Sequence, residues 1–144
     1  MTDIIIRYFH FFGIIFFSSS LVFEHLLLKQ KITNENFKRV CSVNIYFIVS
    51  ALIVFVTGIC LWLVVGKDAS FYTQNPIFHI KITLFLLIIL ISLLPTRYFL
   101  KNKNTQEDII NVPKKMIMFL RVELLFLIII PLLAVLMSQG YGLK

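Results

Sequence analysis

The chain has 144 residues, of which 59% are hydrophobic and only 15% are charged, and its mean hydropathy is +0.92. Soluble domains are roughly 45–50% apolar and about 25% charged, so this composition excludes an ordinary soluble domain and predicts an integral membrane protein. The formal net charge of +7 does not indicate nucleic-acid binding, because the basic residues lie in connectors between apolar runs, where they set topology and contact anionic lipid headgroups.

The first apolar run, Ile4–Leu28, predicts a membrane helix. The alternative is a secretory signal peptide, but the run is too long for one and has no small-residue cleavage site, so we expect the helix to be retained. Five residues at alternating spacings of three and four share one face of this run, as expected for the seam of a helix packed in a bundle. They are His10, Gly13, Phe17, Ser20 and Glu24.

The second apolar run, Cys41–Val65, follows a polar connector at Lys29–Val40. On this predicted helix Asn44, Ala51 and Gly58 recur every seven residues and therefore share one face. Such a face of small residues lets a neighbouring membrane helix approach closely.

The third helix is predicted over residues 76–97. It begins at the turn signal Asn75-Pro76, because proline at the first helical position gives up an N–H that would have no partner there. Pro95 predicts that the helix stops or kinks near this point. Lys81 costs roughly 2.5–3.5 kcal/mol at the centre of a membrane and less near its edge, so we expect it at the interface or facing a cavity.

The fourth helix is predicted over residues 116–137, after the longest polar connector, Lys101–Lys115. Pro113 suits the start of this helix. Pro131 lies inside the helix, where we expect it to produce a kink.

Together the four runs predict an all-α fold: a single four-helix transmembrane domain over residues 1–144, in the inner (cytoplasmic) membrane of a bacterium. Basic residues are concentrated in the first and third connectors, so the positive-inside rule predicts that these connectors face the cytoplasm and that both termini lie outside. The basic residues concerned are Lys29, Lys31, Lys38, Arg39, Arg97, Lys101, Lys103, Lys114 and Lys115.

This topology places polar side chains in two layers. His10 and Lys81 are expected in the outer half of the membrane, whereas Glu24, Asn44 and Arg121 are expected in the inner half. Glu24 with Arg121 could form an intramembrane ion pair, which would give the inner layer a structural role.

His10 is the candidate for an axial haem ligand. An imidazole on an interior seam supplies the ligand atom, and the missing side chain of Gly13 would make room for the flat macrocycle. His79 could be a second axial ligand, and Lys81 could neutralise a haem propionate or a substrate carboxylate. The alternatives are a histidine that bonds a neighbouring helix or a water, an interfacial His79, and a lysine that snorkels to the outer surface.

Several motifs resemble a bacterial family of small four-helix membrane proteins that is classified only as a domain of unknown function. They are the first-helix His10, EHLLLKQ at Glu24–Gln30, KDASFYTQNPIFHIKITLF at Lys67–Phe85, and SxxPT at Ser92–Thr96.

More remotely, the layout is similar to the HemJ-type protoporphyrinogen oxidases and to the CopD copper-resistance domain. The HemJ resemblance implies haem b on His10 and a functional role for Lys81. The tryptophan-rich and Pro-Arg elements expected after the first-helix histidine of HemJ-type proteins are replaced here by FFGIIFFSSS.

We therefore expect a membrane protein that binds haem b between its helices and has a redox role, either electron transfer or HemJ-like oxidation of a tetrapyrrole. Two other classes stay open: a non-catalytic membrane subunit or scaffold, and CopD-like copper handling, which would need clusters of Met, His or Cys. The expected partners are membrane lipids, a second copy of the chain and a redox partner, with no nucleic acid.

Overall fold

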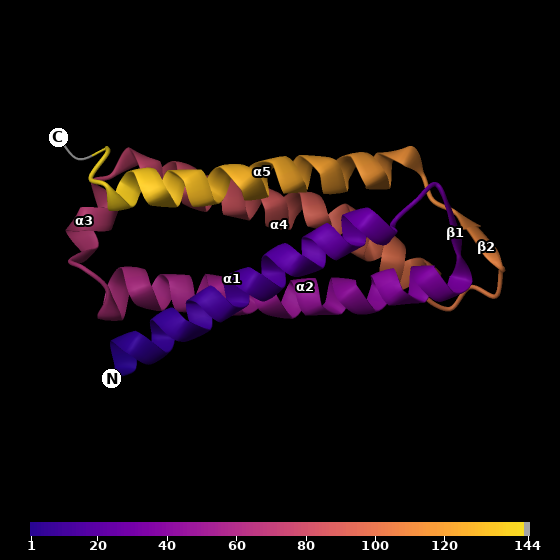
Figure 1. The fold of residues 1–144 in the computed structure, drawn as a ribbon, viewed down its shortest axis with the longest axis horizontal. Coiled ribbons are helices and arrows are strands. Elements are labelled where there is room, and N and C mark those ends of the chain that lie inside the picture. The colour runs from indigo at the N-terminus through magenta and orange to yellow at the C-terminus, as the bar shows by residue number, and fades with distance from the viewer. Residues whose placement is uncertain (143–144) are drawn as a thin grey trace.

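Four long helices run side by side in the computed structural model, which describes residues 1–142, and form an all-α bundle (Figure 1). Each of the four is long and apolar enough to cross a membrane. This confirms the predicted four-helix membrane bundle. The long helices are α1 (Thr2–Leu27), α2 (Asn34–Cys60), α4 (Pro76–Asn102) and α5 (Lys114–Ser138).

Shorter elements connect the long helices at the two ends of the bundle (Figure 1). At one end, α2 continues as the π-helix η1 (Leu61–Val65) and leads through α3 (Ala69–Thr73) to α4. At the other end, strands β1 (Lys31–Thr33) and β2 (Ile109–Asn111) pair antiparallel, with Ile32 opposite Ile110. We name these the terminal end, where α1 starts and α5 finishes, and the sheet end.

The small sheet joins the first and third connectors, which the sequence predicted only as polar loops. In each strand the middle residue is buried and its two neighbours are exposed. Ile32 and Ile110 are 4% and 5% exposed, and both belong to the hydrophobic core. The sheet therefore holds both connectors at one end of the bundle, in agreement with the prediction that they share a side of the membrane.

The helix α2 begins at Asn34, so its predicted start at Cys41 was too late. Thr33 caps the helix by accepting a hydrogen bond from the backbone N–H of Asn36 at 3.4 Å. The first turns carry the fully buried Phe37 and Val40 among exposed polar residues. This part of the helix is amphipathic, so a continuous apolar run is a poor marker of where it starts.

The helix α4 starts as predicted and ends later than predicted. Asn75 caps it by accepting a hydrogen bond from the N–H of Ile77 at 2.9 Å, with Pro76 in the first turn. The helix then continues through Pro95 to Asn102, and Pro95 is completely buried. Packing thus offsets the backbone bond that the proline removes, as is common in membrane helices. The helix α5 likewise continues through Pro131.

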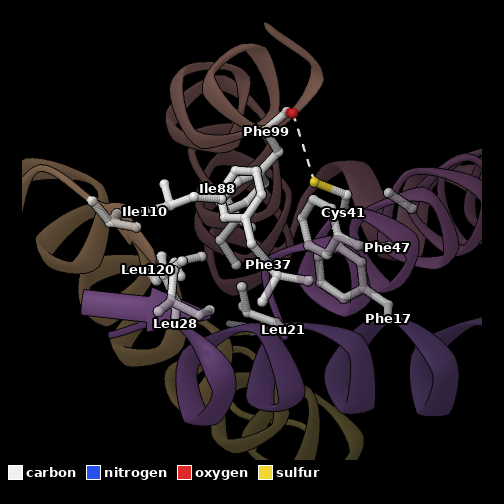
Figure 2. Close-up of a cluster of buried hydrophobic side chains, with 14 residues drawn as sticks. Phe17, Leu21, Leu28, Phe37, Cys41, Phe47, Ile88, Phe99, Ile110 and Leu120 are labelled. Carbon is white, nitrogen blue, oxygen red and sulfur yellow. Dashed lines mark hydrogen bonds between the residues drawn. The ribbon is translucent and has the colours of Figure 1, made fainter. Parts of the chain in front are cut away.

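The hydrophobic core lies toward the sheet end (Figure 2). Its aromatic side chains come from three helices: Phe17 stacks on Phe47 with ring centroids 5.0 Å apart, and Phe37 meets Phe99 edge-on at 6.0 Å. Leu21 and Ile88 belong to the same core and are 0% exposed. This core joins the pair α1–α2 to the pair α4–α5.

Toward the terminal end the two helix pairs are less closely packed. Within residues 1–142, no Cα atom of α1 comes within 8 Å of one in α4, although the side chains of Phe17 and Phe85 meet with ring centroids 5.6 Å apart. The buried residues of α5 are Leu120 and Glu123, both near the sheet end. Side chains in the terminal half are consequently more accessible from between the helices.

Candidate functional site

The first candidate site is centred on His10, in the terminal half of α1. The ring is half-buried against α2, where its Nδ1 lies 2.9 Å from the hydroxyl oxygen of Thr57. The Thr57 hydroxyl donates its single hydrogen to the backbone carbonyl of Ile53, so toward the imidazole it can only accept. Nδ1 of His10 therefore carries the hydrogen, and Nε2 keeps a lone pair that can bind a metal or accept a proton.

Gly58 positions the imidazole. A Cβ atom at this position would lie 3.4 Å from Cε1 of His10, so the ring rests directly against the α2 backbone. The sequence indicated Gly58 only as a helix-packing residue. The periodicity of α2 could not predict that Gly58 lies next to His10. Which residues of α1 and α2 are neighbours depends on how far the two helices are shifted along each other.

Gly13 has a different role from the one expected. A Cβ atom there would lie 3.0 Å from side-chain carbons of both Ile53 and Val54. The space over Gly13 is therefore filled by α2, and the missing side chain brings α1 and α2 together. It offers no room for a flat macrocycle on that side.

Lys81 approaches the same region from α4. Its half-buried ammonium lies 5.7 Å from the ring centroid of Phe78 and is near enough to His10 for the two groups to interact electrostatically. Within residues 1–142, no carboxylate oxygen lies within 4.0 Å of this ammonium. The structure thus places a half-buried cation on α4 with no carboxylate partner among the residues that it describes.

His79 lies elsewhere. It is exposed, and its Nε2 donates a hydrogen bond to the backbone carbonyl of Thr73 at 2.7 Å. This bond ties α4 to α3, and the hydroxyl of Thr73 in turn lies 3.3 Å from the indole nitrogen of Trp62. His79 is therefore held against α3 in an exposed position, although its Nδ1 keeps a lone pair.

A second polar cluster lies toward the sheet end. Glu24 is 1% exposed, and it accepts a hydrogen bond from the side-chain amide of Asn44, 2% exposed, at 3.0 Å. Glu123 of α5 is 0% exposed and lies near enough to Glu24 for their charges to interact. Among residues 1–142, nothing donates a hydrogen bond to either carboxyl oxygen of Glu123.

The predicted ion pair between Glu24 and Arg121 was wrong. Arg121 is exposed, and the ion pairs found within residues 1–142 are the surface pairs Arg7–Asp3 and Arg39–Glu35. Arg121 and Glu123 lie on different faces of α5, and the glutamate is the one that faces inward. The long arginine side chain can extend toward the interface, whereas glutamate is too short to do so.

A metal site built from several side chains is absent from the part of the chain that the structure describes: no three His, Cys, Asp or Glu residues in it gather around one point. The residues that could hold a cofactor are therefore His10, through Nε2, and Lys81, through its ammonium.

Comparison with known proteins bears on the whole chain. Residues 2–142 match the profile of DUF2214, a family described as predicted membrane protein, and the chain belongs to this family. No curated protein and no solved structure shows significant similarity to it. The membership confirms the expected family of membrane proteins of unknown function and agrees with the four membrane-spanning helices.

Proposed function

We propose that this member of the DUF2214 family binds haem b between its helices and has a redox role, with His10 as the axial ligand. The observation that carries the proposal is the hydrogen bond from Nδ1 of His10 to Thr57, which leaves Nε2 free. Metal-binding histidines have this arrangement, in which the second ring nitrogen donates to a neighbouring oxygen and so fixes the tautomer and the ring orientation.

Lys81 supports the same proposal. A half-buried ammonium without a counter-ion is unfavourable in a membrane, and an anionic ligand such as a haem propionate would pair with it. His10 and Lys81 belong to different helix pairs, so a ligand that engages both would lie between α1 and α4, whose backbones stay apart. Bound haem would supply a one-electron redox couple, while these residues hold and orient it.

Single ligation is part of the proposal. The expected second ligand, His79, is exposed and held against α3 by its bond to the carbonyl of Thr73, so the proposal does not include it. Electron transfer and HemJ-like tetrapyrrole oxidation both remain compatible with one histidine ligand. The role of His10 does not depend on which of them applies.

An absorption spectrum tests the proposal. The protein is expressed with ample haem, purified in detergent and measured before and after dithionite, alongside His10→Ala and the matched control His79→Ala. We expect a Soret band that sharpens on reduction in the wild type and in His79→Ala, and no such band in His10→Ala. A colourless wild type, or equal haem in His10→Ala, would contradict the proposal.

The second candidate function is a non-catalytic membrane subunit. It is favoured by the extensive lipid-accessible surface, because in the most apolar window of α5 only 11% of residues are buried. A colourless protein in which His10→Ala is as stable as the wild type would support it, and crosslinking in membranes would then show whether α5 contacts a second copy or another protein.

Copper handling predicts stoichiometric copper in the purified protein.

We also propose that the sheet end faces the cytoplasm of a bacterium. The basic connectors lie at this end, and positively charged loops are retained on the cytoplasmic side. A C-terminal alkaline phosphatase fusion should be active, and a C-terminal fluorescent protein dark, if the terminal end lies outside. The reverse result would invert the topology.

A further inference from the structure

Glu24 and Glu123 are buried carboxyl groups on the two helices, α1 and α5, that join the helix pairs. Glu24 belongs to α1 and Glu123 to α5, and both side chains are at most 1% exposed. Glu24 has one donor, the amide of Asn44. Glu123 has two oxygens that are buried without any donor from residues 1–142.

No positive charge balances this pair in the part of the chain that the structure describes. Within residues 1–142, no nitrogen of Lys, Arg or His lies within 4.0 Å of either carboxyl group. The other titratable groups of the surrounding helices do not compensate. On α1, Nδ1 of His25 is itself buried without a partner. On α2 the thiol of Cys41 donates to a backbone carbonyl, as does the hydroxyl of Tyr98 on α4.

Two ionised carboxylates in this position would be strongly unfavourable. A buried, unpaired charge carries a desolvation penalty of several kcal/mol, and two like charges in one apolar site also repel each other. Burial without a counter-ion therefore favours the neutral, protonated form of each carboxyl group. The unpartnered carboxyl oxygens of Glu123 mark one position where such a proton would be bound.

We propose that Glu24 and Glu123 form an intramembrane proton-binding site in which both carboxyl groups are protonated at neutral pH. A proton suits the site better than a metal ion. Ca²⁺ takes about six to eight oxygen ligands and Mg²⁺ about six, whereas this site offers two carboxyl groups and the amide of Asn44. Ionisable groups of this kind inside a membrane commonly mark proton relays.

The proton site is independent of the haem proposal, because it lies in the other half of the bundle from His10. It also joins the helix pairs through α1 and α5, which contact each other directly. Protonation or deprotonation of these carboxyl groups would therefore change the α1–α5 contact that joins the two helix pairs.

Infrared spectroscopy tests the proposal on the full-length protein in detergent at neutral pH. A protonated carboxyl group has a carbonyl stretching band that an ionised carboxylate lacks. We expect this band in the wild type and expect it to disappear in the double variant Glu24→Gln/Glu123→Gln. The matched control is Glu35→Gln, whose side chain is exposed and paired with Arg39, and it should keep the band.

Absence of the band from the folded wild type would overturn the proposal, and this result does not depend on any variant folding. Persistence of the band in the folded double variant would also overturn it. If a metal ion occupied the site instead, the band would be absent, and added Na⁺, K⁺, Mg²⁺ or Ca²⁺ would raise the Tm of the wild type but not of the double variant. His10→Ala should keep the band with or without haem, so each proposal can fail alone.

Discussion

At the scale of single residues, the hydroxyl of Thr57 determines which nitrogen of His10 is free. It donates to the carbonyl of Ile53 and accepts from Nδ1 of the imidazole. A sequence pattern could identify His10 as a candidate ligand, but not this partner, which lies on another helix. The same limit applies on α5, where the sequence predicted Arg121 in the inner layer and only packing shows that Glu123 is the residue that faces inward.

Thr57→Val should weaken haem binding. Valine keeps the shape of threonine and removes the acceptor, so the imidazole is no longer held in one tautomer and orientation. We expect haem affinity to fall by roughly 10–100-fold, the usual effect of losing such a partner, measured by titrating haem into the purified apoprotein. Thr83→Val is the matched control, because the hydroxyl of Thr83 is exposed and bonds only its own helix. Equal affinities in Thr57→Val and the wild type would show that the bond is not needed.

At the scale of helices, the number and type of the long elements followed from apolar run length, because a membrane span demands a continuous apolar helix. Helix ends were less predictable. The start of α2 depends on a cap and an amphipathic turn, and the passage of α4 through Pro95 depends on burial of that proline. The paired strands β1 and β2 are short and far apart in the chain, so local patterns did not predict them.

Two glycines of the α1–α2 pair should respond differently to alanine. Gly13→Ala places a Cβ atom 3.0 Å from Ile53 and Val54, which must move, whereas Gly58→Ala meets only the edge of His10 at 3.4 Å. We expect Gly13→Ala to lower the free energy of unfolding by about 1–3 kcal/mol. Gly58→Ala should change it less and should alter the haem spectrum instead. Detergent-based unfolding and absorption spectra measure the two effects. The reverse ranking would contradict the assignment of Gly13 to helix packing.

At the scale of the whole molecule, the sheet and the core near it hold the two helix pairs together. Figure 2 shows Ile110 of β2 in the same cluster as Leu28 and Leu120, so the strand contributes directly to the core. The sequence predicted that the first and third connectors share one side of the membrane. It did not predict that they pair.

Ile110→Ala should therefore destabilise the protein, although it lies in a connector. It removes a side chain that is only 5% exposed, and we expect a loss of about 2–5 kcal/mol in the free energy of unfolding. Ile109→Ala is the control in the same strand, because Ile109 is 57% exposed and should change stability by less than about 0.5 kcal/mol. A similar loss in the free energy of unfolding for both variants would show that burial of Ile110 in the core does not account for its contribution to stability.

The apolar stretch of α1 between its two polar positions has an electrical consequence. His10 and Glu24 lie on one helix, about 21 Å apart at a rise of 1.5 Å per residue. At an effective dielectric constant of about 20, unit charges at this separation interact by about 0.8 kcal/mol. For one electron this corresponds to about 35 mV. A change of one charge at the carboxyl pair would thus shift the midpoint potential of a haem on His10 by a few tens of millivolts. A shift of this size tunes electron transfer and does not prevent it.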